Sequence, residues 1–405
     1  MSPTQNSTLT LRRSTRTIAF SLLCATTACS TQHLPASPSE TPAANSGKPL
    51  SVATLNPQRA PDVLPLPATP EPLTATSINR SSDLTPFQQW SEVNQFLDGL
   101  VIRHGFTRTE LDAIFSKVTL NKTTLQLIKP APPGKPKNWE VYRARFVDPL
   151  RIKAGAKFWD KYADALNLAQ QRFGIPPEII IGILGVETIY GKNVGNFNTL
   201  DAITSLAFAY PDTPNRDARM AYFRGELEQT LLFAREEGID PFSLQGSYAG
   251  AIGLPQFMPS SIRKYAIDFD GDGKIDLRNS PIDAIGSIAN FLVNHGWQTG
   301  LPLVFPTTIT GNPDSMVAKK LEASYSLQEL QAVVAPVVGL SQSQPPVELQ
   351  YGLIDLQNGT NPTEYWLATS NFFVITKYNQ SYFYAMSVID LGIAICNFRK
   401  NVRSQ

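Results

Sequence analysis

A glutamate at the end of an apolar segment is the side chain in this sequence best suited to acid chemistry. Residues 176–188 read Pro-Pro-Glu-Ile-Ile-Ile-Gly-Ile-Leu-Gly-Val-Glu-Thr, so Glu187 follows an uninterrupted apolar run. Burial raises the pKa of a carboxyl group, and a carboxylic acid that stays protonated near neutral pH is a general acid. From this segment alone, a structural glutamate that caps a loop or pairs with a distant arginine explains Glu187 equally well.

An acidic loop is the second candidate site. Its carboxylates and its glycine have the spacing that opens an EF-hand calcium loop, namely Asp268, Asp270, Asp272 and Gly273. The position that usually holds the last ligand is Asn279, and Asp283 is the nearest later carboxylate. An acidic surface turn is the alternative, but the spacing favours a bound Ca²⁺ with a structural role.

Two further segments offer hydrogen bonds without charge. Residues 246–261 are rich in glycine and alanine and include Ser247, Tyr248 and Gln256. Residues 371–379 combine aromatic rings with amide side chains. Both compositions suit an uncharged, polyhydroxylated ligand such as a sugar in a largely apolar cleft. Taken separately, each segment is equally compatible with tight packing inside a core.

The elements that would position these side chains are mostly helices. Apolar residues at helical spacing predict a mainly α protein, with a small strand-containing insert after residue 303. The Pro176-Pro177 pair suits the first turn of the helix that ends at Glu187. Helices are expected over 87–104, 107–118, 152–172, 177–188, 200–209, 219–237, 281–294 and 366–396, with a short one at 327–330 inside the insert.

The N-terminal residues predict export. Three arginines precede a short apolar run at 18–25, which is the pattern of a signal peptide and is too short to span a bilayer. Ala28-Cys29 then resembles a bacterial lipoprotein cleavage site, so we expect residues 1–29 to be a signal peptide and Cys29 to be lipidated. Ser30 favours the outer membrane and a periplasmic location. Plain secretion is the alternative. Residues 30–84, rich in Pro, Ser and Thr, are expected to form a disordered tether.

The overall composition excludes other classes of protein. The formal net charge of +1 argues against a nucleic-acid-binding protein, which would carry an excess of basic residues. Three cysteines give neither a disulfide framework nor a zinc pattern. The three histidines are far apart in the sequence, which disfavours a histidine metal site or a Ser-His-Asp triad.

Together these segments resemble the lytic murein transglycosylase B family of bacterial cell-wall enzymes. The resemblance runs from about Trp90 to near the C-terminus. The motifs that carry it are Gly-Val-Glu-Thr at 185–188, Asn-Thr-Leu-Asp-Ala at 198–202, Ser-Tyr-Ala-Gly-Ala at 247–251, Gln-Phe-Met-Pro-Ser-Ser at 256–261, Asp-Ala-Ile-Gly-Ser at 283–287 and Tyr-Asn at 378–379.

The resemblance implies a lysozyme-like α-helical core with an accompanying α domain, at 85–302 and 366–405, and a small strand-containing domain at 303–365. It places Glu187 at the family's catalytic position. The residues that it implies for the sugar cleft are Tyr142, Arg219, Ser247, Gln256, Tyr378, Asn379 and Tyr384. Those that it implies for a calcium site, within the loop 268–283 of the core, are Asp268, Asp270, Asp272, the Lys274 carbonyl and Asp283.

The implied activity is non-hydrolytic cleavage of the β-1,4 bond between N-acetylmuramic acid and N-acetylglucosamine, which leaves a 1,6-anhydromuramoyl end. Most glycosidases need two carboxylates, but one suffices if the substrate supplies the nucleophile. The alternatives are a lysozyme-like hydrolase of the same polymer and a non-catalytic murein-binding protein. We expect a monomer whose partners are glycan strands, the outer membrane and proteins of cell-wall synthesis.

Overall fold

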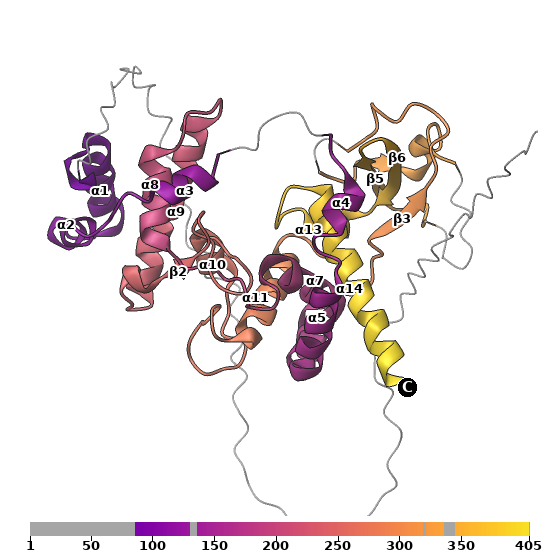
Figure 1. The fold of residues 1–405 in the computed structure, drawn as a ribbon, viewed down its shortest axis with the longest axis horizontal. Helices are drawn as coiled ribbons and strands as arrows, with labels where there is room; N and C mark the ends of the chain where they lie inside the picture. The colour runs from indigo at the N-terminus through magenta and orange to yellow at the C-terminus, as the bar shows by residue number, and fades with distance from the viewer. Residues whose placement is uncertain (1–85, 130–135, 319–320, 336–344, 405) are drawn as a thin grey trace, which may run out of the picture. The chain divides into compact units, whose positions relative to one another are not determined.

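The computed structural model describes residues 86–129, 136–318, 321–335 and 345–404, and these residues form a mainly α-helical protein with a four-stranded sheet and a short two-stranded ladder (Figure 1). Cys29 and the N-terminal segments predicted as signal peptide and tether lie outside the described residues. Among the described helices, none has both the length and the apolar character needed to cross a membrane.

The helix that carries Glu187, α7 (Pro177–Thr188), lies at the centre of the largest group of buried side chains. Its closest neighbour is the long C-terminal helix α14 (Tyr382–Arg403). Glycines allow this approach, because a Cβ added at Gly182 would lie 2.2 Å from the Val388 carbonyl oxygen, and one at Gly392 would lie 2.2 Å from that of Glu178. The two backbones therefore pack closer than larger side chains would permit.

The remaining helices of this core surround α7. On one side α5 (Pro149–Lys161) packs against α14, and α6 (Ala163–Phe173) packs against α11 (Pro281–Asn294). The shorter members are α4 (Trp139–Arg143), α10 (Pro259–Tyr265) and α13 (Ser370–Ile375). The acidic loop connects α10 to α11, so the candidate metal site belongs to the same core as Glu187.

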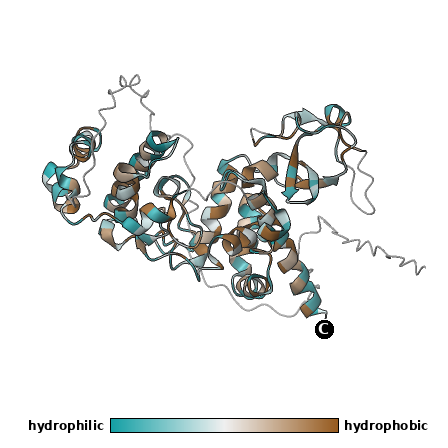
Figure 2. Ribbon diagram, turned by 45° about the horizontal axis from the view of Figure 1, so that its top comes forward, coloured by the Kyte–Doolittle hydropathy of each residue, from teal (hydrophilic) through white to brown (hydrophobic). Residues whose placement is uncertain are grey.

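A second group of buried side chains is made by helices and the short segments that join them. Its members are η1 (Phe87–Gln89), α1 (Ser91–His104), α2 (Arg108–Phe115), α3 (Lys122–Leu127), α8 (Thr199–Ala209) and α9 (Arg216–Glu236). Figure 2 shows hydrophobic residues concentrated where helices pack and hydrophilic residues on their outer faces. Glu226 of α9 reaches the first core, where its carboxylate accepts hydrogen bonds from the backbone N–H (3.0 Å) and hydroxyl (2.7 Å) of Ser260.

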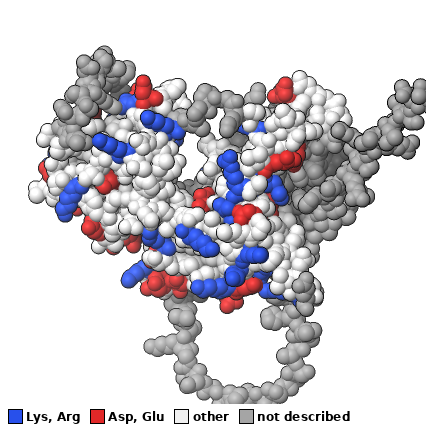
Figure 3. All heavy atoms as spheres, in the orientation of Figure 1, with Lys and Arg blue, Asp and Glu red and all other residues white. Residues whose placement is uncertain are grey.

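The sheet has its own buried side chains and the strand order β3-β6-β5-β4. Its strands are β3 (Val304–Thr307), β4 (Tyr325–Ser326), β5 (Gln350–Asn358) and β6 (Asn361–Ala368), all paired antiparallel, with α12 (Leu327–Leu330) beside them. A separate two-stranded ladder joins β1 (Phe197–Asn198) to β2 (Gln245–Gly246), and the short η2 (Pro241–Ser243) precedes β2. Figure 3 shows positive and negative side chains interspersed on the face that it displays.

Several predicted helices are wrong in their bounds. The helix expected over 87–104 is interrupted at Trp90, and the one expected over 107–118 ends at Phe115. The helix expected over 152–172 is interrupted at Tyr162, because α5 and α6 pack against different partners, and the ring of Tyr162 lies 4.6 Å from that of Phe158. The helix expected over 366–396 begins as strand, since Trp366 and Leu367 pair with β3 and β5, and the rest is divided between α13 and α14. The domain boundary placed at 365 therefore falls inside β6. A short apolar run does not distinguish strand from helix by its periodicity.

Candidate active site

Glu187 lies in the last turn of α7, where the chain reverses sharply. The next two residues, Ile189 and Tyr190, have positive φ angles of 52° and 59°, and the Tyr190 N–H donates to the Leu184 carbonyl at 3.1 Å. The Thr188 hydroxyl donates to the Leu254 carbonyl at 3.0 Å and accepts from the Gly191 N–H at 3.0 Å. These bonds hold the helix end in one conformation, which fixes the position of the Glu187 side chain.

The Glu187 carboxyl group lies in an apolar, partly enclosed environment. Burial raises its pKa to about 7, and the Tyr384 hydroxyl, which donates to Glu187 Oε1 at 2.7 Å, opposes part of that increase. No other carboxylate among the described residues contributes to this pKa. Glu187 is therefore a carboxyl group that changes protonation state near neutral pH without coupling to a second carboxylate among the described residues.

Tyrosine rings form the surroundings of Glu187. The rings of Tyr378 and Tyr384 are stacked at 6.3 Å with an interplanar angle of 13°, and the Tyr378 hydroxyl donates to the Pro255 carbonyl. Tyr142 contacts Phe383 edge-to-face at 5.3 Å. Burial raises the pKa of Tyr142, Tyr378 and Tyr384, and the negative charge of Glu187 raises each pKa further. All three hydroxyl groups therefore stay protonated and remain hydrogen-bond donors.

The small-residue segment forms a tight loop beside this group. Gln256 has a φ of 52°, and its side-chain Nε2 donates to the carbonyls of Gly253 at 2.9 Å and Val194 at 3.2 Å. Because both bonds use the amide nitrogen, the amide Oε1 keeps its capacity to accept a hydrogen bond. The Ser247 Oγ accepts from the Ala251 N–H at 3.1 Å and retains its own proton. The loop thus offers two uncharged groups to a ligand, an acceptor at Gln256 Oε1 and a donor at the Ser247 hydroxyl.

Four residues expected in the sugar cleft, Ser247, Gln256, Arg219 and Asn379, show no direct contact with Glu187 among the described interactions, and the last two are exposed. Arg219 is exposed on α9, where its guanidinium group lies over the rings of Tyr210, Tyr222 and Phe223. Asn379 is exposed in the turn after α13. Both remain predictions as sugar-binding residues.

The sequence reasoning missed Phe383 and Thr188. Phe383 forms part of the aromatic wall around Tyr142, and Thr188 fixes the turn after Glu187. Each is the direct neighbour of a predicted site residue, which is the signal that could have drawn attention to it. Thr188 belongs to the Gly-Val-Glu-Thr motif, but both roles depend on contacts with residues distant in the sequence, so the sequence alone could not define them.

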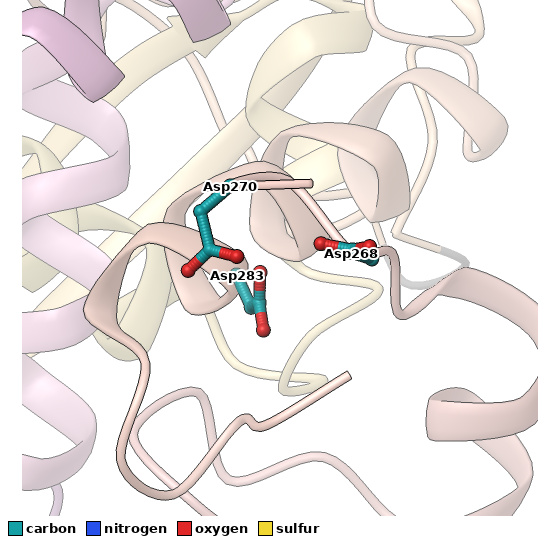
Figure 4. A group of neighbouring side chains, drawn as sticks. All are labelled: Asp268, Asp270 and Asp283. Atoms are coloured by element: carbon teal, nitrogen blue, oxygen red, sulfur yellow. The ribbon is translucent and has the colours of Figure 1, made fainter. Parts of the chain in front are cut away.

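The acidic loop gathers three carboxylates. Oxygen atoms of Asp268, Asp270 and Asp283 all lie within 4.8 Å of one another (Figure 4). Asp283 is 1% exposed, and its two oxygens accept from the backbone N–H groups of Phe269 at 2.8 Å and Asp276 at 2.9 Å. Carboxylate oxygens are the ligands that Ca²⁺ prefers, and this spacing matches oxygens around one hard cation.

The other two predicted metal ligands belong to exposed residues of the loop. The Asp272 side chain is exposed, and its Oδ1 accepts from the Lys274 N–H at 2.8 Å. Lys274 is likewise exposed. The loop between the first carboxylates and Asp283 is also closed by Ser280, whose hydroxyl donates to Asp270 Oδ2 at 2.9 Å and accepts from the Asp283 N–H at 3.1 Å. Asp272 and the Lys274 carbonyl stay predictions.

A helical core that holds one protonated carboxyl group among tyrosines and uncharged hydrogen-bonding groups defines an enzyme of the lysozyme-like, glycan-cleaving class. Residues 87–393 match the family model described as the transglycosylase SLT domain. The chain is 42% identical to membrane-bound lytic murein transglycosylase B of Escherichia coli K12. The aligned region of 313 residues covers 74% of this chain and 81% of that protein.

Solved structures agree with this match. Soluble lytic transglycosylase SltB1 of Pseudomonas aeruginosa is 40% identical with a TM-score of 0.68, covering 76% of this chain and 99% of that one. The Escherichia coli lytic transglycosylase SLT35 in complex with calcium is 40% identical with a TM-score of 0.67, covering 78% of this chain and 95% of that one. The chain belongs to the lytic murein transglycosylase B family and is a peptidoglycan-cleaving lytic transglycosylase with a lysozyme-like fold.

The hydrogen bond from Tyr384 leads to a prediction about pH dependence. It stabilises the ionised form of Glu187, so Tyr384→Phe should raise the Glu187 pKa further above its value of about 7. The alkaline limb of kcat/KM on peptidoglycan, where the acid form is lost, should then move upward by about 0.5–1 pH unit. Tyr378→Phe is the matched control, because its hydroxyl bonds to Pro255 and not to Glu187. An equal shift in both variants would contradict the assignment.

Proposed function

We propose that Glu187 acts first as the acid and then as the base in cleavage of the bond between N-acetylmuramic acid and N-acetylglucosamine. The protonated carboxyl group donates its proton to the glycosidic oxygen as the bond from that oxygen to C1 of the muramic acid breaks. The acetamido oxygen of the same sugar stabilises C1. The Glu187 carboxylate then removes the proton from the O6 hydroxyl, and O6 bonds to C1. The product is a 1,6-anhydro ring, and no water is consumed.

The observation that carries this proposal is the bond between Tyr384 and Glu187 at the end of an apolar helix. A pKa of about 7 keeps both protonation states of Glu187 populated near neutral pH, which suits a residue that must give and then take a proton. A hydrolase of the usual two-carboxylate kind needs a second carboxylate within several ångströms. The pKa of Glu187 shows no influence of one among the described residues.

Substrate-binding roles follow from the groups that remain available. Gln256 Oε1 would accept from an acetamido N–H, and Ser247 would donate to a sugar oxygen. Tyr142, Tyr378 and Tyr384 would supply ring faces next to the reacting bond. Tyr142 would also donate from its hydroxyl, whereas the hydroxyl protons of Tyr378 and Tyr384 are already bound to Pro255 and Glu187. We retain Arg219 and Asn379 as residues that contact more distant sugars of the strand.

We further propose that the acidic loop binds a structural Ca²⁺. Asp268, Asp270 and Asp283 offer oxygen ligands at suitable spacing, and the solved SLT35 structure is described as a complex with calcium. The ion would neutralise three neighbouring negative charges and tie the start of α11 to the loop. Because this loop packs in the same core as α7, the ion would support the site from a distance and take no part in the reaction.

The arrangement of the chain in the cell is also a proposal. The Escherichia coli relative is named as membrane-bound, which supports a periplasmic enzyme held at the outer membrane through a lipid on Cys29. The segment 30–84 would serve as a tether. The three groups of buried side chains support a division into a catalytic core, an α domain and a strand-containing domain, the last extended to Ala368.

Glu187→Gln tests the assignment of the catalytic residue. Glutamine keeps the size of the side chain but donates no acidic proton, so release of anhydromuropeptides should fall by at least about a hundredfold. Mass spectrometry of digested sacculi measures this product, which is one water lighter than a hydrolysed end. The variant should be the more stable protein by about 1–3 kcal/mol above pH 7, because the wild type must ionise a group whose folded pKa is raised. That difference should develop between about pH 4.5 and 7. Anhydromuropeptide release at the wild-type rate would refute the assignment.

Calcium binding should be visible in thermal unfolding. At a hundred times its dissociation constant, Ca²⁺ should add about 2.7 kcal/mol to the free energy of unfolding, and a chelator should remove this gain. Asp270→Asn should abolish the effect while leaving the calcium-free protein nearly as stable, because Asp270 is exposed. The same measurement on Asp272→Asn decides whether that carboxylate is also a ligand. A melting temperature of the wild type that is the same with and without Ca²⁺ would exclude a calcium site in this loop.

Lipidation of Cys29 should determine where the protein fractionates. Cys29→Ala removes the acceptor thiol, so the protein should move from the outer-membrane fraction to the soluble periplasmic fraction. Immunoblotting of the separated fractions checks this, and mass spectrometry of the N-terminal peptide of the wild type should show the attached acyl chains. Wild-type protein that is soluble and unmodified would support plain secretion instead.

A further inference from the structure

Glu226 is a buried carboxylate to which the proposed reaction gives no role. It is 5% exposed in the middle of α9, and no Lys or Arg among the described residues forms an ion pair with it. Its Oε2 accepts from the backbone N–H of Ser260 at 3.0 Å, and its Oε1 accepts from the hydroxyl of the same residue at 2.7 Å. Burial of a carboxylate is costly unless hydrogen bonds replace its hydration. Glu226 therefore binds Ser260 through both oxygens and ties α9 to α10.

The position of Ser260 explains why a carboxylate suits this contact. Ser260 is the second residue of α10, so its backbone N–H has no acceptor within the helix. The N-terminal end of a helix carries a partial positive charge, which favours a neighbouring carboxylate. Glu226 thus satisfies a donor at the helix end, and it fixes the start of α10 against α9.

Gln256 lies in the loop that leads into α10. Its φ of 52° is unfavourable for a residue with a side chain and persists only where the surrounding structure imposes it. Ile252 and Phe257 close the loop by exchanging backbone hydrogen bonds at 2.8 and 3.1 Å. Only two residues then separate Phe257 from Ser260, and one of them is Pro259, whose ring fixes φ. A displacement of Ser260 would therefore reach Gln256 through a short and stiff connection.

We propose that Glu226 is a positioning residue, which holds Ser260 so that the Gln256 amide oxygen faces the acetamido N–H of the muramic acid. No interaction among the described residues joins Glu226 to Glu187, so its effect on the reaction passes through Gln256. Without this support, the reacting sugar would bind in more than one orientation. The proposal rests on the sugar-binding role assigned to Gln256 and adds the residue that supports that role.

A double-mutant cycle between Glu226 and Gln256 tests this proposal. On glycan strands, Glu226→Ala should lower kcat by about tenfold and change KM by less than about twofold, because misorientation weakens the transition state more than binding. Gln256→Ala should lower kcat at least as much. The combined variant should lie within about twofold of Gln256→Ala, since the amide that Glu226 positions is already absent. Glu226→Gln should keep at least about a third of the wild-type kcat, because glutamine can accept from the Ser260 N–H and donate to its hydroxyl.

Glu236→Ala is the matched control for this cycle. Glu236 also joins α9 to α10, through hydrogen bonds of 2.6 and 2.8 Å from Arg263, but Arg263 lies in the last turn of α10 and not at its start. Its removal should therefore leave kcat within about twofold of the wild type. A fall in Glu236→Ala equal to that in Glu226→Ala would overturn the proposal.

The cycle also separates positioning from a general loss of stability. If Glu226→Ala lowers kcat by the same factor in the wild type and in Gln256→Ala, the proposal is wrong, because an effect on stability or on nearby Tyr222 does not depend on Gln256. Should Glu226→Ala fail to fold, Ser260→Ala takes its place with an expected fall of about threefold, because it removes one of the two bonds. A wild-type rate in Gln256→Ala would instead refute the sugar-binding role on which the proposal rests.

Discussion

The close contact between α7 and α14 brings the carboxyl group of Glu187 within hydrogen-bonding distance of the Tyr384 hydroxyl, and the candidate active site depends on this helix contact. Gly182 and Gly392 remove the side chains that would hold the two backbones apart. The apolar surroundings that result keep Glu187 protonated at a pH where a solvated glutamate would be ionised. The hydrogen bond from Tyr384 limits the increase in the Glu187 pKa. A wider helix spacing would admit water and return the pKa toward its ordinary value.

Around this contact the protein uses neutral groups wherever charge would disturb the acid. Three tyrosines with raised pKa values, a glutamine with its nitrogen already bonded, and a serine surround the reacting region. A nearby cation would lower the pKa of Glu187, and a nearby carboxylate would raise it further and couple the two titrations. The absence of such influences on Glu187, among the described residues, fits a reaction in which one group is both acid and base.

Charged side chains are instead found in two regions outside the immediate surroundings of Glu187. The acidic loop between α10 and α11 collects three carboxylates that suit a structural cation, and Asp283 also accepts hydrogen bonds from the backbone N–H groups of Phe269 and Asp276. On the side of the sheet, Lys137 and Arg145 line a cleft whose walls include Tyr142.

Several features were determined by the sequence itself because they depend on neighbours along the chain. The apolar run before Glu187, the Pro176-Pro177 start of α7 and the spacing of Asp268 and Asp270 are local patterns, and they predicted the helical core, the acid and the metal loop. The family motifs supplied the fold and the reaction. Only the tertiary structure decided that Asp283 joins Asp268 and Asp270 in one group, that Arg219 lies against a different group of aromatic rings, and that Trp366 continues a strand. Those outcomes depend on contacts between segments far apart in sequence, where packing and strand pairing override local preference. The same reason explains the break at Tyr162 and the cleft beside Tyr142, since each is made by elements that meet only in the folded chain.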